Sequence, residues 1–308
     1  ASISQSYGWD DSSEEAKAFL GLSRDDARTA IIEWFSENKL LAEVKPYTHS
    51  VGHSYRSHVP IEPWLSSQWY VAVTDDKLRG SALRAQDPSQ TPDLPHDVED
   101  RGKDDGDGEL TFYPERYAKT YYSWHEGIRD WCISRQLWWG HRIPVWYKED
   151  KIYCGTTAPD EDGWIQEEDV LDTWFSSWIW PMATLGWPND SEDLKHFYPS
   201  QDLVTGPDII FFWVARMIMS GLYFKNEIPF SNVYFTSIIR DDKGRKMSKS
   251  LGNSPDALEL FDKYGVDAVR VSILMMAPQG LDIHFKEDRL EQGRNFMNKL
   301  WNCSRFIM

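Results

Sequence analysis

The sequence predicts an α/β fold built on a parallel sheet, because a strand, a glycine turn and a helix follow one another more than once. One such unit covers 203–224, where a short β-rich segment ends at Gly206 and a long apolar segment follows. A second covers 232–265, where a strand leads into a glycine-containing loop and a further helix. Strands that alternate with helices in this way are typical of parallel sheets covered by helices.

The first third of the chain is expected to combine helices with short strands. Apolar residues at helical spacing predict helices over 13–20 and 23–40, and Ser23 is placed to cap the second one. Residues 51–73 alternate more like strands and turns. The stretch 86–110 holds nine Asp and Glu residues against two Lys and Arg, together with three prolines, so we expect an exposed loop there.

The middle of the chain is rich in aromatic residues. Residues 110–113 read as a short strand, and the proline that follows suits the first turn of a helix over 114–129. Residues 131–147 predict a strand, a turn around Gly140 and a second strand, and 148–168 reads as a polar hairpin. The predicted helix places four large residues on one face: Tyr117, Tyr121, Trp124 and Ile128.

The next segments carry the expected core. Residues 172–180 predict a buried helix or turn, and 203–205 a short strand. The helix expected over 208–224 contains the most apolar run of the chain, which is far too short to span a bilayer. We therefore expect a buried helix and no membrane segment. Residues 232–239 predict a strand that leads directly into a basic loop.

After that loop, Ser254 is expected to cap a helix that has Pro255 in its first turn and Gly265 at its end. Helical spacing then continues up to Met308, and the sequence does not begin with methionine. We therefore expect the chain to be a piece excised from a longer protein.

Composition narrows the class of protein. The chain has 308 residues, 41% of them apolar, and a formal net charge of −16, which suits a globular protein and argues against one that coats nucleic acid. Local basic patches can still contact tRNA. The three cysteines form no Cys-x-x-Cys pair, and the first residues are polar, so we expect a reducing compartment, the cytoplasm.

The basic loop is the most informative segment of the sequence. Between Arg240 and Lys249 lie five cationic side chains, and Gly244 and Gly252 bracket the loop with backbone freedom. Lysines on a mobile loop can stabilise the negative charge that builds on pyrophosphate when a carboxylate attacks the α-phosphate of ATP. The alternative interpretation is a solvated basic turn.

Four segments together resemble the valyl-tRNA synthetases, a family of class I aminoacyl-tRNA synthetases. The resemblance begins near Leu22 and leaves 1–21 and 75–108 unexplained. Isoleucyl and leucyl enzymes share the general plan, but the isoleucyl family lacks the Trp-Trp-Gly-His pattern found here. The four segments are Asp130–Pro144, Asp169–Ser177, Val204–Arg216 and Lys246-Met247-Ser248-Lys249-Ser250.

The resemblance implies that ATP and Mg²⁺ are used to activate valine, which is then transferred to tRNA(Val). It implies that Lys246 and Lys249 hold the ATP phosphates and stabilise the transition state, with Ser248 as a hydroxyl donor. It further implies that Gly206 and Asp208 contact the adenosine side of the nucleotide. A turn glycine followed by a helix-terminal charge is the alternative for the last two.

The valine pocket, by the same resemblance, is lined by Trp139, Val170 and Trp174. Ordinary core aromatics are the alternative, and Trp138 could take the place of Trp139. A small apolar pocket cannot strongly reject threonine; valyl enzymes are the standard example of this limit, and the family overcomes it by hydrolytic editing.

The resemblance also implies three parts. Residues 1–68 would be the end of an inserted editing domain, 69–285 the second half of a Rossmann-like catalytic domain, and 286–308 the start of a helical stem. The His-x-Gly-His motif of the first half is absent from the sequence. We therefore expect this chain alone to be inactive, to need the remainder of the synthetase, and to leave a sheet edge unpaired.

No editing residue and no metal ligand is assigned. Ser54 and Ser57 stand where many relatives carry a Cys-x-x-Cys pair, and the nearby histidines, His49, His53 and His58, are expected to be structural or solvated. Three other functions stay open: a nucleotide- or tRNA-binding fragment without catalysis, an isoleucyl-tRNA synthetase relative, and a generic nucleotidyl transferase.

Overall fold

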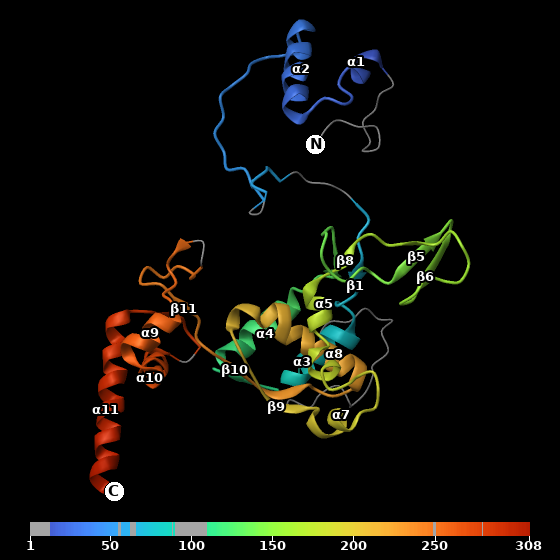
Figure 1. Cartoon of the computed structure of the whole chain (residues 1–308). Helices are drawn as coiled ribbons and strands as arrows, with labels where there is room; N and C mark the ends of the chain where they lie inside the picture. The colour runs from blue at the N-terminus through green and yellow to red at the C-terminus, as the bar shows by residue number, and fades with distance from the viewer. Residues whose placement is uncertain are drawn as a thin grey trace. The chain divides into compact units, whose positions relative to one another are not determined.

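The computed structural model divides into two compact units, Ala1–Ser66 and Ser67–Met308 (Figure 1). The residues that the structure describes are 13–54, 57–61, 66–87, 89, 110–248, 251–278 and 280–308. Most of the acidic stretch 86–110 thus lies outside the described residues. The three-part assignment at 1–68, 69–285 and 286–308 stays a prediction.

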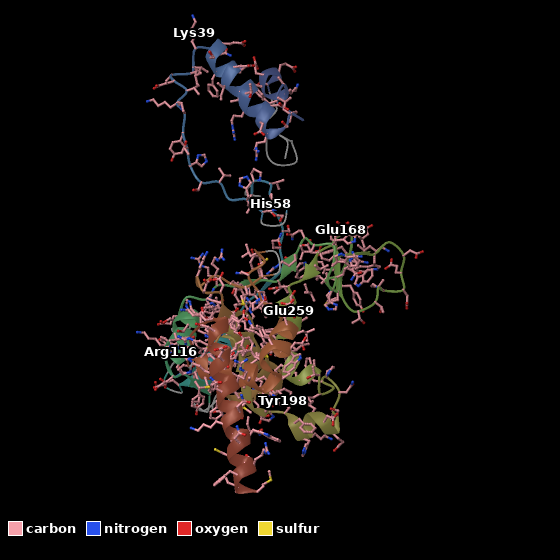
Figure 2. All side chains as sticks on the ribbon, turned by 60° about the vertical axis from the view of Figure 1, so that its left-hand side comes forward. Lys39, His58, Arg116, Glu168, Tyr198 and Glu259 are labelled. Atoms are coloured by element: carbon pink, nitrogen blue, oxygen red, sulfur yellow. The ribbon has the colours of Figure 1, made fainter. Side chains whose placement is uncertain are left out.

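The amino-terminal unit contains the helices α1 (Glu14–Lys17) and α2 (Arg24–Glu37). Ser23 caps α2, as predicted, because its side chain accepts a hydrogen bond from the Asp26 amide at 3.2 Å. Past α2, Lys39 and His58, both labelled in Figure 2, have positive φ angles of 56° and 57°. Of the strands expected from residue 51 onward, the described residues of this unit show one bridge, His53 to Pro60.

The carboxy-terminal unit is built on a three-stranded parallel sheet in the order β2-β10-β9, which confirms the predicted fold class. The strands are β2 (Thr111–Tyr113), β10 (Phe230–Phe235) and β9 (Ser200–Thr205). Val233 at the centre is fully buried and pairs with Phe112 on one side and Leu203 on the other. The β-rich sequence of β10 suits this doubly flanked position.

One apolar crossover connects β9 to β10 and forms the centre of the core. It begins as the 3₁₀ turn η3 (Pro207–Ile209), widens into the π-helix η4 (Ile210–Val214) and continues as α8 (Ala215–Lys225). Every residue from 215 to 222 is buried. Pro207–Lys225 is long and apolar enough to cross a membrane by length and composition alone, and half of its most apolar part is buried inside the protein.

Two further helical segments pack on this crossover: α4 (Arg116–Glu126), and η2 (Asp76–Gly80) with α3 (Ser81–Gln86). Tyr121 is fully buried, and its hydroxyl donates to the Ala82 carbonyl at 2.9 Å. The predicted face is confirmed, because Tyr121 belongs to this core and Tyr117 and Trp124 of α4 pack against it, as does Ile128 just beyond the end of the helix.

The tryptophan-rich middle forms small antiparallel sheets. The strands pair as β1 (Tyr70–Val71) with β3 (Trp131–Cys132), β4 (Ser134–Arg135) with β8 (Val170–Leu171), and β5 (Val145–Lys148) with β6 (Lys151–Cys154) and β7 (Ile165–Gln166). The predicted strand, turn and strand over 131–147 are present, because β3 and β4 precede Gly140 and β5 follows it. The strands β3 and β4 pair with β1 and β8, however, and not with β5. Alternating apolar residues indicate strands but do not select their partners. The hairpin expected over 148–168 forms instead over Val145–Cys154 between β5 and β6, and β7 pairs with β5 and not with β6.

Short helices follow β8: α5 (Thr173–Ser177), α6 (Trp180–Ala183) and α7 (Glu192–Phe197). The end of the chain adds the parallel pair β11 (Ile239–Arg240) and β12 (Ile283–His284), then α9 (Ala257–Tyr264), α10 (Val266–Met276), η6 (Glu287–Arg289) and α11 (Leu290–Ile307). A second core of Leu260, Tyr264, Ala268, Val269 and Leu290 holds these helices together.

The start of α9 corrects one prediction. Asp256, and not Ser254, is its N-cap, because the Asp256 carboxylate accepts from the Leu258 amide at 2.8 Å. The helix therefore begins after Pro255 instead of at it. Gly265 ends α9 as predicted, with φ of 88°.

Candidate functional site

The basic loop begins as a tight turn directly after β11. Arg240 forms a bridge with Lys246, and the Asp241 amide donates to the Arg245 carbonyl at 3.0 Å. Gly244 closes the turn with φ of 76°, and its amide donates to the Asp241 carbonyl at 3.0 Å. Arg240 also forms an ion pair with Asp282, which anchors the turn beside β12.

Asp241 organises this turn from inside. Its carboxylate accepts from the amides of Lys243 at 3.1 Å and Arg245 at 2.7 Å, from Arg245 Nε at 2.8 Å and from Asn253 Nδ2 at 3.0 Å. The Asn253 hydrogen bond, and then the bonds from Arg245, hold the pKa of this carboxyl well below its usual range. A carboxylate that accepts several such bonds stays ionised and fixes the loop base.

Asn253 connects the two ends of the loop. Its Oδ1 accepts from the Ser248 amide at 2.9 Å, and its Nδ2 also lies 3.2 Å from the Lys246 carbonyl. The Ser248 hydroxyl accepts from the Leu251 amide at 3.3 Å. The Lys246 side chain is exposed, whereas Lys249 lies outside the described residues. The loop thus has a fixed base and a lysine directed to solvent.

The predicted adenosine-side residues lie at the carboxyl edge of the sheet. Gly206 follows β9, and a Cβ added there would lie 2.8 Å from Asp208 Oδ1 and 2.9 Å from Ile238 Cδ1. Ile238 belongs to the segment between β10 and the basic loop. The structure therefore brings Gly206, the exposed Asp208 and the entry to the basic loop together, where nucleotides bind in open parallel sheets.

The predicted valine-pocket residues have three different environments. Trp139 is 84% exposed, whereas Val170 is 3% exposed and lies against Gly140. Trp174 on α5 is half-buried and stacks on Phe212 of η4, with ring centroids 5.5 Å apart. Among the described residues no ring contact joins Trp139 to Trp174. The structure links Trp174 to the crossover that begins at Gly206, and the pocket itself stays a prediction.

A buried charge cluster lies beside Trp174 and was missed from the sequence. Asp172 is 5% exposed, and its Oδ2 accepts from Trp131 Nε1 at 3.0 Å and from Arg135 Nη2 at 2.9 Å. Arg216 Nη1 lies 3.6 Å from the same oxygen. Burial lowers the pKa of Arg216 to about 10, although Asp172 raises it. The only signal in the sequence was a single arginine inside an apolar helix.

Comparison with known proteins decides the family. A family model described as tRNA synthetases class I (I, L, M and V) matches residues 24–161 and 157–286. The chain belongs to the class I tRNA synthetases. The same residues that carried the sequence resemblance therefore lie inside a class I domain.

Two curated relatives are named valine–tRNA ligase. The one from Chlorobaculum tepidum is 50% identical over 299 residues, covering 94% of this chain and 31% of the relative. The one from Streptococcus thermophilus is 47% identical over 297 residues, covering 96% of this chain and 31% of the relative. The class I chain thus spans about a third of the length of the curated relatives it matches.

A solved class I enzyme supports the fold. Mycobacterium tuberculosis methionyl-tRNA synthetase bound by methionyl-adenylate aligns with a TM-score of 0.54 at 21% identity, covering 80% of this chain and 40% of that chain. At this identity the likeness concerns the fold alone.

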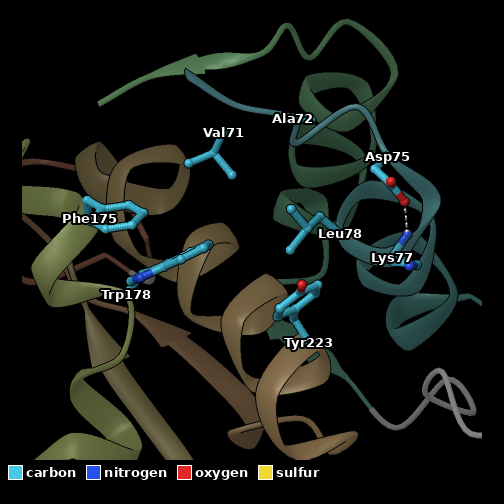
Figure 3. Close-up of a pocket in the computed structure, with 8 residues that line it drawn as sticks. All are labelled: Val71, Ala72, Asp75, Lys77, Leu78, Phe175, Trp178 and Tyr223. Atoms are coloured by element: carbon cyan, nitrogen blue, oxygen red, sulfur yellow. Dashed lines mark hydrogen bonds between the residues drawn. The ribbon is translucent and has the colours of Figure 1, made fainter. Parts of the chain in front are cut away.

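One cavity of this class I chain lies apart from the predicted site residues. A cavity of about 350 Å³ is drawn in Figure 3, with Phe175 and Trp178 of the α5 region facing Leu78 and Tyr223. Neither Gly206 nor Trp174 lines it. Within the described residues no group of three His, Cys, Asp or Glu side chains could hold a metal ion.

Proposed function

We propose that this chain is part of the catalytic core of a valine–tRNA ligase, which activates valine with ATP and transfers it to tRNA(Val). One observation carries the proposal: the identity to valine–tRNA ligases, 46% to 50%, extends over nearly the whole chain. The family model covers four amino-acid specificities, so the choice of valine rests on these relatives.

The proposed reaction begins with the attack of a valine carboxylate oxygen on the α-phosphorus of ATP. This step forms valyl-adenylate and breaks the bond to pyrophosphate, on which negative charge accumulates. Lys246 and Lys249 are proposed to approach that charge as the loop closes, with Ser248 adding a donor. The base held by Asp241 and Asn253 gives the loop a fixed hinge. Mg²⁺ is proposed to arrive with the ATP phosphates.

The other side of the site is proposed to hold the adenosine and the amino acid. Gly206 lets the nucleotide approach the backbone, and Asp208 can accept hydrogen bonds from ribose hydroxyls. Trp139, Val170 and Trp174 are proposed as the walls of the valine pocket. The contact of Trp174 with Phe212 supports this arrangement, because it places one wall on the crossover that begins at Gly206.

The proposed partners are tRNA(Val), valine and the remainder of the synthetase polypeptide, and the proposed location is the cytoplasm. The remainder is needed because the His-x-Gly-His motif is absent from this sequence. The alternative, a nucleotide- or tRNA-binding fragment without catalysis, is not favoured, because the relatives that match nearly the whole chain are named valine–tRNA ligase.

A chimera tests the proposal. The 308-residue chain replaces the matching segment of the Chlorobaculum tepidum valine–tRNA ligase, and valine-dependent ATP–pyrophosphate exchange is measured. We expect exchange with valine to exceed exchange with isoleucine, leucine and methionine. Absence of exchange in a folded chimera, with the parent ligase active, would overturn the proposal. Calorimetric titration of a valyl-adenylate analogue into the isolated chain then tests the fragment alternative, which tight binding disfavours.

A further inference from the structure

The short helix α5 contacts the η4–α8 crossover at its start, its middle and its end. At its start, the Asp172 carboxylate accepts from the Trp174 amide at 3.3 Å and lies beside Arg216 of α8. At its end, Trp213 Nε1 donates to the Ser177 carbonyl at 3.1 Å. Trp174, between these two points, stacks on Phe212 of the same crossover. A five-residue helix has little stability of its own, so these contacts fix its position.

Asp172 is the point where most of these contacts meet. Its amide donates to the Ile133 carbonyl at 2.7 Å. Its carboxylate accepts a hydrogen bond from Trp131 and forms ion pairs with Arg135 and Arg216. Three separate chain segments therefore depend on one buried carboxylate. Removing its charge would leave two guanidinium groups facing each other without an anion.

Arg216 is held in place mainly by its stacking on the Trp131 ring. Its guanidinium carbon lies 3.7 Å from the centroid of the Trp131 ring, the distance of a stacked cation–π contact. The side chain is only about one-tenth exposed, and Nη1 has no hydrogen-bond partner among the described residues. The position of Arg216 is thus set by the Trp131 face and by Asp172 together.

We propose that Asp172 and Arg216 are positioning residues that set the place of Trp174 and thereby the size of the amino-acid pocket. This inference rests on the proposed function. Arg216 belongs to the helical segment that begins beside Gly206, so the pair connects the wall of the pocket to the adenosine side of the site. Neither residue touches a substrate in this account; both act through α5.

The first test measures α5 directly in the 308-residue chain. In Asp172→Asn, the amides of residues 173–178 are expected to exchange with deuterium at least about tenfold faster than in the parent chain. The matched control is Asp76→Asn, which breaks an equally buried pair with Arg84 on η2 and α3. It is expected to speed exchange there and not in α5. Unchanged exchange in α5 of Asp172→Asn would overturn the inference.

The second test measures specificity in the chimera. A pocket distinguishes one methylene by about 10- to 200-fold, so a displaced Trp174 is expected to lower the kcat/KM ratio of valine over isoleucine about tenfold in Asp172→Asn. A purely structural role lowers the active fraction for both amino acids equally and leaves this ratio unchanged, as expected for Asp76→Asn. An unchanged ratio in Asp172→Asn would overturn the role in specificity.

Milder variants cover the case in which Asp172→Asn does not fold. Arg216→Lys keeps the charge but loses the planar contact with Trp131, and Trp131→Phe removes the indole donor and part of the ring on which Arg216 stacks. Both are expected to move the ratio in the same direction by a smaller factor, and no movement in either overturns the inference. A parent chimera without valine-dependent exchange refutes the proposed function instead, while deuterium exchange still decides the role of Asp172 in fixing α5.

Discussion

Asn253 Nδ2 donates to Asp241 Oδ2 at 3.0 Å, and this bond closes the base of the basic loop. The two residues lie at opposite ends of the loop, so the lysines between them extend from a fixed pair of points. Asn253 is the better of the two to change, because it also orders the Ser248 amide at 2.9 Å without carrying a charge.

Asn253→Ala is therefore expected to lower kcat for ATP–pyrophosphate exchange in the chimera by about tenfold or more, with a smaller change in the KM for valine. The physical reason is that a misplaced loop loses contacts made mainly in the transition state. Asp242→Ala, at an exposed position of the same turn, is the control and should keep the parent kcat. Equal kcat values for the two variants would refute the role given to Asn253.

His125 predicts a dependence of stability on pH. The ring is fully buried, with Nδ1 2.9 Å from the Tyr121 carbonyl oxygen, and burial lowers its pKa to about 4. In the unfolded chain its pKa is about 6.5. Between pH 6.5 and pH 4 the ring is therefore protonated in the unfolded state and neutral in the folded state, which favours unfolding. The contribution to stability is complete above pH 6.5 and is lost progressively as the pH falls towards 4.

Urea unfolding at pH 7.5 and pH 5.5 measures this effect. One pKa unit corresponds to about 1.4 kcal/mol, so His125 should account for a loss of about 1.4 kcal/mol in the free energy of unfolding between these two pH values. His125→Phe should remove that part of the loss. The same loss in the parent chain and in His125→Phe would show that the ring does not titrate as described.

Gly80 is required by the buried Asp76–Arg84 ion pair. A Cβ at Gly80 would lie 1.6 Å from Asp76 Oδ1, and this carboxylate binds Arg84 through two hydrogen bonds of 2.9 and 3.0 Å. Gly80→Ala must displace the carboxylate, and breaking a buried pair costs about 3 to 5 kcal/mol. We expect a decrease of that order in the free energy of unfolding measured in urea.

Gly127→Ala is the matched control, because the nearest atom to its added Cβ is 3.8 Å away. The free energy of unfolding of this variant is expected to stay within about 1 kcal/mol of that of the parent chain. A similar small effect for Gly80→Ala would mean that the pair does not constrain η2.

The edge of the sheet at β9 is expected to pair between copies of the isolated chain. Val204 on this strand is 61% exposed, and a cavity of about 860 Å³ lined by Trp180, Phe197 and Trp213 runs beside it. Exposed edges with apolar side chains associate readily. Sedimentation at increasing concentration should show self-association, weakened about tenfold or more by Val204→Lys. A strictly monomeric, cooperatively folded parent chain would contradict this expectation.

The sequence predicted what local patterns determine. The strand at 110–113, the face of α4 and the end of α9 at Gly265 follow from residue spacing and backbone preference. The sheet order and the partners of β3 and β4 did not follow, because pairing depends on residues far apart in the chain. For the same reason the cluster of Asp172 and Arg216, which come from different elements, was not foreseen.

The candidate site shows the same division. Gly206 and Asp208 lie directly after β9, as the short strand and the glycine that follows it predicted, and their contact with the nucleotide stays a prediction. The exposure of Trp139 was not predictable from the sequence. A segment rich in tryptophan does not show which of its rings are buried in the core. The capping by Asp256 was missed because Ser254 and Asp256 are both good capping residues.

The most direct test of the central claim is Lys249→Ala in the chimera, assayed by valine-dependent ATP–pyrophosphate exchange. If the basic loop stabilises the leaving pyrophosphate, kcat falls about 100-fold or more while the KM for valine changes little. An unaltered kcat would contradict the claim.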